Sequence, residues 1–160
     1  MIPANSLLTP VAVVVDANIP IAICANEPGA SNASIAVNQY ISQQVDFFAP
    51  GAILAETLYV LCGKMHDGTI TVAEHALAIQ DFALFMRLIK SPPGGEGSLV
   101  LRAEAVRGTY TCRRSSDGIY IALAEALAMS VSTSLLTFDA DMARQAAREA
   151  PAVTIHLVRT

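Results

Sequence analysis

The sequence is poor in aromatic and charged residues. It has no tryptophan, and aromatic residues make up only 6% of the chain, with no grouping that suggests a platform for stacking single-stranded bases. Charged residues make up 15%, against roughly 25% in ordinary soluble domains. The net charge of −4 gives no global attraction to nucleic acid, so any contact with a phosphate backbone must be local.

The sequence also lacks a continuous apolar run of about 20 residues, the length that a transmembrane helix needs. The longest candidate, residues 7–15, ends at Asp16, and the N-terminus has neither the positively charged start nor the cleavage site of a signal peptide. The three cysteines are odd in number and far apart in the chain, at Cys24, Cys62 and Cys112. We expect them to be small buried side chains in a cytoplasmic protein, and not a disulfide framework or a metal knuckle.

Apolar residues, by contrast, are abundant, at 53% of the 160 residues. A chain of this length fits one domain, residues 1–160, and this much apolar material can build a sizeable core. The surplus indicates that part of the apolar surface is buried against a partner or a second copy. We therefore expect a homodimer or a hetero-complex, with no membrane contact.

Strand-length apolar runs alternate with stretches of helical periodicity. We predict strands over residues 11–15, 45–48, 131–136 and 153–158, and helices over residues 30–44, 51–65, 71–90, 99–110, 116–129 and 140–148. Thr71 and Glu74 form a capping box at the start of one helix, and residues 91–98 have the composition of a loop. This alternation predicts an α/β fold with a mostly parallel sheet, in which ligands collect at the carboxyl ends of the strands.

Two acidic residues follow predicted strands. Asp16 comes directly after the run 11–15, and Asp139 follows the strand that ends near Leu136. Both carboxylates should therefore lie at the carboxyl edge of the sheet. An Asp in this place is also a common turn former or helix cap, so neither residue alone identifies a site.

Two further acids belong to predicted helices. Asp117 begins the apolar helix 116–129, where an acid is also favoured by the helix dipole. Glu56 lies inside the helix 51–65, at the border of an apolar arc, where it could also be a solvated rim residue. Carboxylates that converge in one cleft repel each other unless a cation is present, and Mg²⁺ or Mn²⁺ takes carboxylate and water oxygens as ligands. The three histidines are isolated from one another in the sequence and suggest no competing site.

Four segments carry a family resemblance. VVVDANIPIAI resembles the first strand and Asp-x-Asn start of PIN domains, and PGAILAETLYVL resembles the segment with their conserved Glu. SSDGIYIALAEAL resembles the helix that opens with their third acid, and SVSTSLLTFDADMA resembles the strand that ends in Thr-x-Asp. The apolar segment VTIHLV falls where the family has its last strand. The resemblance covers about residues 11–158, nearly the whole chain.

The resemblance implies a three-layer α/β/α sandwich and cleavage of RNA with Mg²⁺ or Mn²⁺. It implies that Asp16, Glu56, Asp117 and Asp139 hold the metal, directly or through water. Stand-alone bacterial and archaeal members, the VapC toxins, are commonly silenced by a small antitoxin, which would be the expected partner here. The candidate residues for orienting the carboxylates are Asn18, Ser116, Thr137 and Asp141. Asp141 is also a possible fifth acid of the site.

Some positions near the predicted site are less well specified. Ser116 could bond to Asp117 or cap the helix, and Asp141 could be a ligand or an exposed acid. Arg113 and Arg114 precede Asp117 and could meet phosphates at the mouth of the cleft, or could be solvated residues before a helix. Gly118 stands where many relatives carry Ala, and we expect it to loosen the helix start tolerably, by up to about 1 kcal/mol.

Other functions fit the sequence less well. A response-regulator receiver usually has paired acids after its first strand and a late Lys, whereas Asp16 stands alone and no Lys follows Lys90. A haloacid-dehalogenase-like phosphatase would need a second Asp where Asn18 stands. A non-catalytic PIN-like module that binds protein or RNA remains as the alternative, although the four retained carboxylates favour a nuclease.

Overall fold

A parallel sheet lies at the centre of the computed structural model, which describes residues 10–108 and 116–160. Its strands are β1 (Ala12–Val15), β2 (Asp46–Phe48), β3 (Ile89–Lys90), β4 (Thr133–Thr137) and β5 (Thr154–Leu157). They are ordered β3-β2-β1-β4-β5, and every pair of neighbours is parallel. The prediction of a mostly parallel sheet is confirmed, and β1 is its central strand.

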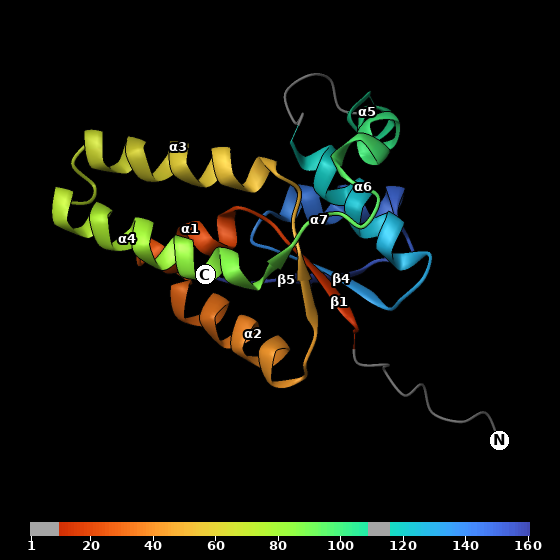
Figure 1. Ribbon diagram of the computed structural model, residues 1–160, viewed down its shortest axis with the longest axis horizontal. Helices are drawn as coiled ribbons and strands as arrows, with labels where there is room; N and C mark the ends of the chain where they lie inside the picture. The colour runs from red at the N-terminus through yellow and green to blue at the C-terminus, as the bar shows by residue number, and fades with distance from the viewer. Residues whose placement is uncertain (1–9, 109–115) are drawn as a thin grey trace.

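Helices cover both faces of this sheet (Figure 1). The helices are α1 (Asn18–Cys24), α2 (Ala30–Ser42), α3 (Ala52–His66), α4 (Val72–Phe85), α5 (Val100–Gly108), α6 (Asp117–Ala128) and α7 (Ala140–Glu149). Ala12 and Val14 of β1 pack into one core with α6 and α7, whereas Val13 and Val15 pack into a second core with α2. Since β1 is buried on both faces, its sequence is a continuous apolar run. The three-layer α/β/α prediction is confirmed.

Most predicted elements form, with ends that differ by one to a few residues. The capping box is present, because Glu74 N donates to Thr71 Oγ1 and Thr71 N donates to the Glu74 carboxylate. The helix predicted to run to residue 90 is wrong at its end. The α-helix stops at Phe85, a 3-10 turn covers Met86–Leu88, and β3 then pairs with β2. Helix α1 was not predicted. The two elements that were not predicted, α1 and β3, are too short to show a clear periodicity.

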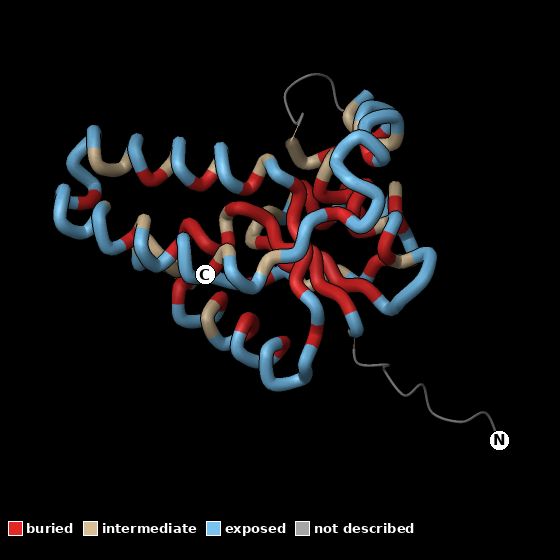
Figure 2. Tube along the Cα trace, in the orientation of Figure 1, coloured by how far each residue is buried: buried red, intermediate tan, exposed pale blue. Residues whose placement is uncertain are grey.

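Helices α3 and α4 form an antiparallel hairpin that extends beyond the sheet (Figure 1). Along α3, Ile53 and Leu61 are buried, but Leu54 and Leu58 of the predicted apolar arc are 46% and 44% exposed. Figure 2 shows the outer sides of both helices as largely exposed. Cys62, expected to be buried, is exposed, while Cys24 is partly buried and Cys112 lies outside the described residues. The hairpin therefore presents apolar side chains to solvent.

None of the helices in the described ranges is long and apolar enough to cross a membrane.

Candidate active site

Asp16 lies at the carboxyl end of the central strand, where a hydrogen-bond network joins β1 to β4. It is 6% exposed, and Thr137 Oγ1, at the end of β4, donates to Asp16 Oδ2 over 2.6 Å. Asn18 Nδ2 donates to the same Thr137 hydroxyl over 3.2 Å, and Phe138 N donates to Asn18 Oδ1. The structure thus brings Asn18 and Thr137 together beside Asp16, as expected of residues that orient this carboxylate.

Two more of the predicted acids influence Asp16. The pKa of Asp16 is raised from 3.8 to about 7, chiefly by burial. The Thr137 hydrogen bond lowers this pKa, and the negative charges of Asp117 and Glu56 raise it. Asp117 is the first residue of α6 and Glu56 lies in α3, and both side chains are partly buried. Carboxylates from β1, α3 and α6 therefore share one region of negative potential at this edge of the sheet.

Glu56 has a partner that the sequence did not reveal. Tyr120 Oη donates to Glu56 Oε2 over 2.8 Å and joins α6 to α3. Burial and then the negative charges of Glu56 and Asp16 raise the pKa of Tyr120, so its hydroxyl stays protonated and acts as a donor. Tyr120 follows Asp117 by three residues, and this spacing on a helix is the one sequence signal that could have pointed to it.

Asp139 has a structural task at the start of α7. Its Oδ1 accepts from Asp141 N over 2.7 Å and from Met142 N over 3.1 Å, so Asp139 is the N-cap of this helix. Asp139 N donates to Thr137 Oγ1 over 2.9 Å, which links Asp139 to the Asp16 network. Asp141 forms an ion pair with Arg144 one turn along α7, and its side chain is 43% exposed.

We predict that the cap and the charge of Asp139 can be separated. Asp139→Ala should lower the free energy of unfolding by about 1 kcal/mol, because two N–H groups of α7 lose their acceptor. Asp139→Asn should retain most of that stability, since Asn is an equally good N-cap. Chemical denaturation of both variants checks this. Equal losses in the two variants would mean that the charge, and not the cap, stabilises α7.

Ser116 and the two arginines are less informative. Ser116 directly precedes α6, but its side chain makes no capping hydrogen bond, so the second of its two possible roles, the helix cap, is not formed. Arg113 and Arg114 lie outside the described residues.

Comparison with known proteins shows the family to which this fold belongs. A model of the PIN domain family matches residues 13–148, most of the chain. The chain belongs to the PIN domain family. A comparison with curated proteins finds no match. Among solved structures, the chain is similar to a chain of VapBC2 from Rickettsia felis bound to a DNA fragment from its promoter, with a TM-score of 0.58 and 12% identity. The alignment covers 92% of this chain and 99% of that chain, so the two share a fold.

The acids of this PIN domain suit a hard divalent cation in their chemistry. All the donors are oxygens, and Asp16 is buried beside two other carboxylates whose repulsion a cation would relieve. Within residues 10–108 and 116–160, however, no group of three or more His, Cys, Asp or Glu side chains is already arranged to hold a metal ion. A divalent cation bound here would therefore need water oxygens as ligands beside the carboxylates.

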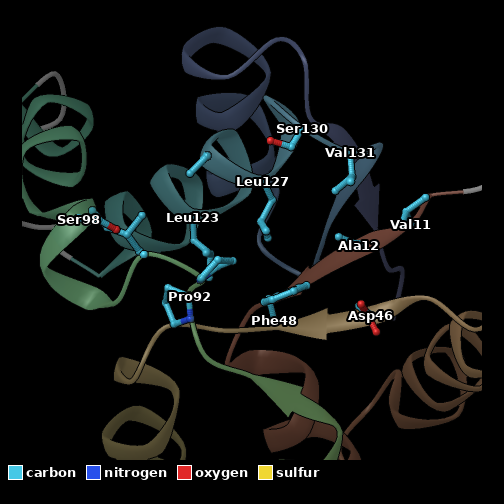
Figure 3. A pocket seen from close by; sticks show the side chains of 14 residues that line it. Val11, Ala12, Asp46, Phe48, Pro92, Ser98, Leu123, Leu127, Ser130 and Val131 are labelled. Atoms are coloured by element: carbon cyan, nitrogen blue, oxygen red, sulfur yellow. The ribbon is translucent and has the colours of Figure 1, made fainter.

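A well-defined hollow lies elsewhere in the PIN domain. A cavity of about 480 Å³ opens between α6 and the amino-terminal ends of β1 and β2 (Figure 3). Leu123 and Leu127 of α6 line it together with Ala12 and Phe48. Among the described residues, its lining includes one charged side chain, Asp46, which is paired with Lys90. The cavity is thus apolar and at the edge of the sheet opposite to Asp16. The carboxylate cluster, and not this cavity, is the candidate active site.

Proposed function

We propose that this PIN domain is a metal-dependent endoribonuclease that hydrolyses RNA phosphodiester bonds with Mg²⁺ or Mn²⁺. The observation that carries the proposal is the buried Asp16. Its pKa is raised to about 7 by burial and by the charges of Asp117 and Glu56. Such an arrangement is unfavourable without a cation, so its presence at the carboxyl edge of the sheet favours a metal site over a structural role.

We assign the metal to four carboxylates. Asp16, Glu56 and Asp117 would hold the ion, and Asp139, which uses Oδ1 to cap α7, would offer Oδ2 to the ion or to its water. A bound divalent ion supplies an activated water and stabilises charge on the phosphodiester oxygens. Thr137 and Asn18 fix the orientation of the Asp16 carboxylate through their hydrogen bonds at the end of β4.

The substrate must be attracted locally, because most cations of the described residues are already paired. Ion pairs of Lys or Arg with Asp or Glu occupy Lys64, Lys90, Arg102, Arg107 and Arg144. We assign phosphate contacts to Arg113 and Arg114, which precede Asp117 in the sequence. An active-site contact near Asp117 would offset the repulsion between a phosphate and the carboxylates.

We also propose that the partner is a small antitoxin and that the protein is the toxin of a toxin–antitoxin pair. We place this role in the cytoplasm, where RNA is made and where free thiols such as those of Cys24 and Cys62 stay reduced. The outer face of α3 supports a protein partner, since Leu54, Leu58 and Tyr59 are 46%, 44% and 82% exposed. The similar VapBC2 structure from Rickettsia felis is a complex bound to promoter DNA. A second copy of this chain would cover the same apolar surface.

The test is cleavage of a panel of structured and single-stranded RNAs with Mn²⁺, with Mg²⁺ and with a chelator. We expect wild-type protein to cut with metal only, and Asp117→Asn to fold normally but to cut at least about 100-fold more slowly. The reason is that a metal site supplies several kcal/mol of transition-state stabilisation. Asp81→Asn, which changes an exposed acid of α4, is the matched control and should cut like wild type.

Each result has a distinct meaning. Unchanged cleavage by Asp117→Asn would remove Asp117 from the site. Wild-type protein that neither cuts any RNA nor binds metal would instead be a non-catalytic binding module. Metal binding without cleavage would retain the site and leave the substrate to be found.

A further inference from the structure

Tyr120 is bonded to one acid of the site and lies close to a second, Asp16, without being an acid itself. It is one helical turn after Asp117, so α6 presents both side chains from the same face. Tyr120 is 1% exposed and belongs to the core that α6 shares with β1. Its ring is therefore fixed by packing on all sides, and its hydroxyl has a fixed position relative to Asp117.

That hydroxyl reaches a residue 64 positions away in the chain, because Tyr120 Oη donates to Glu56 Oε2 over 2.8 Å. Glu56 belongs to α3, which continues away from the sheet as half of the projecting hairpin (Figure 1). The side chain of Glu56 is only partly buried, so water is available to it as an alternative environment. The hydrogen bond from Tyr120 holds one Glu56 oxygen toward the core.

Repulsion acts against this arrangement. Asp16 is close enough to Glu56 and Asp117 for both charges to act on it. If the Glu56 side chain were unrestrained, turning it toward solvent would therefore lower its electrostatic repulsion with Asp16. Tyr120 offers Glu56 a neutral donor close to Asp16. A hydrogen bond to a charged acceptor is among the stronger ones in proteins, and it restricts the rotamers of a flexible side chain.

From these contacts we infer that Tyr120 is a positioning residue, which holds Glu56 beside Asp16 and Asp117 so that the three carboxylates receive the metal ion together. The inference rests on the proposed function. One oxygen of Glu56 is held by Tyr120, and the carboxylate keeps its remaining acceptor positions for the ion or its water. Partners of this kind around metal ligands commonly change metal affinity by 10-fold to 100-fold.

Tyr40 supplies a matched control. It belongs to α2, is 7% exposed and packs in the second core, and its hydroxyl lies 2.7 Å from His156 Nδ1. Tyr40→Phe and Tyr120→Phe therefore each remove one hydrogen-bonded hydroxyl from a buried ring. Only the second hydroxyl touches a carboxylate of the proposed metal site.

The experiment measures Mn²⁺ affinity by calorimetry and by the electron paramagnetic resonance signal of free Mn²⁺, without RNA. We expect Tyr120→Phe to bind Mn²⁺ roughly 10-fold to 100-fold more weakly than wild type, and Tyr40→Phe to bind it like wild type. Circular dichroism and thermal unfolding establish that both variants fold. In a Glu56→Ala background, Tyr120→Phe should cause no further loss, because Tyr120 acts through Glu56.

Several outcomes overturn the inference. Wild-type affinity in Tyr120→Phe would show that Glu56 needs no positioning by the hydroxyl. An equal loss of Mn²⁺ affinity in Tyr40→Phe would show that removing a buried hydroxyl affects the fold in general. An equal loss from Tyr120→Phe in the Glu56→Ala background would show that Tyr120 does not act through Glu56. Should Tyr120→Phe not fold, thermal unfolding of Glu56→Gln tests the hydrogen bond instead. The Gln side-chain oxygen still accepts from Tyr120, so this variant should keep the thermal stability of the wild type. Failure of the wild type to bind Mn²⁺ would reject the proposed metal site itself, which is a different result.

Discussion

Asp16→Asn is expected to abolish metal-dependent cleavage and, in the absence of metal, to make the protein more stable at about pH 8 than the wild type. Activity should fall at least about 100-fold because Asp16, one of the proposed metal ligands, loses its charge. Stability should rise because the variant no longer buries a carboxylate that burial and two neighbouring negative charges disfavour. A neutral Asn can still accept the hydrogen bond from Thr137.

The pH dependence of this gain follows from the pKa of Asp16. Folding raises that pKa from 3.8 to about 7, so between these values the folded state binds more protons than the unfolded state. The contribution of Asp16 to stability is therefore fully present below about pH 4 and is lost as the pH rises through about 7. The stability advantage of Asp16→Asn should grow over this window to on the order of 1–4 kcal/mol.

Denaturant unfolding in a chelator at about pH 4.5 and about pH 8 measures this difference. Added Mn²⁺ should reduce the advantage of the variant by stabilising the wild type alone, by about 2.7 kcal/mol at 100 times its dissociation constant. A stability difference that does not vary with pH would mean that Asp16 is not held at a raised pKa. Loss of activity together with loss of stability would assign Asp16 to the fold and not to catalysis.

The second large effect is expected at Gly118, the residue after Asp117. A Cβ atom at this position would lie 2.7 Å from the carbonyl oxygen of Ala103, in the backbone of α5. Such a contact cannot relax by a side-chain rotation, so Gly118→Ala must push α5 and α6 apart. We expect a loss of about 1–3 kcal/mol in the free energy of unfolding, together with weaker cleavage as Asp117 is displaced.

Gly63 provides the control for this prediction. It lies in the interior of α3, and a Cβ atom there would meet nothing within 4 Å. Gly63→Ala should therefore stabilise the protein by up to about 1 kcal/mol, because Ala favours the helix. The two changes are chemically identical and should have opposite signs in thermal unfolding. A stable Gly118→Ala variant would show that α5 can withdraw from α6 without cost.

Gly118 also shows what sequence reasoning could not supply. From the sequence, this glycine is a mild weakness at a helix start, and the sequence contains no sign of its contact with α5. The structure makes it a requirement, because α5 approaches α6 too closely for any side chain. A contact between two helices depends on how they are placed on the sheet, and local propensity contains no information about that placement.

The strands and the region of the acids were more predictable. The run at residues 12–15 is apolar throughout because β1 is central and covered on both faces, so its burial was visible in the sequence. The parallel order then puts the ends of β1 and β4, with Asp16 and Thr137, side by side. The role of Tyr120 was not visible, since a tyrosine in an apolar helix is first a core residue. Strand β3, with two residues, carries no pattern at all.

Because β1 pairs with β4, the site at the ends of these strands can form only after β4 has been synthesised. Asp16 and the Thr137 hydroxyl that binds it are 121 positions apart, and β4 follows three of the four acids in the chain. A nascent chain that has emerged only as far as α6 contains Asp16, Glu56 and Asp117, yet its central strand still lacks a neighbour on one side. Formation of the carboxylate cluster therefore requires β4, and a fragment cut short before β4 should contain three of the four acids without the site.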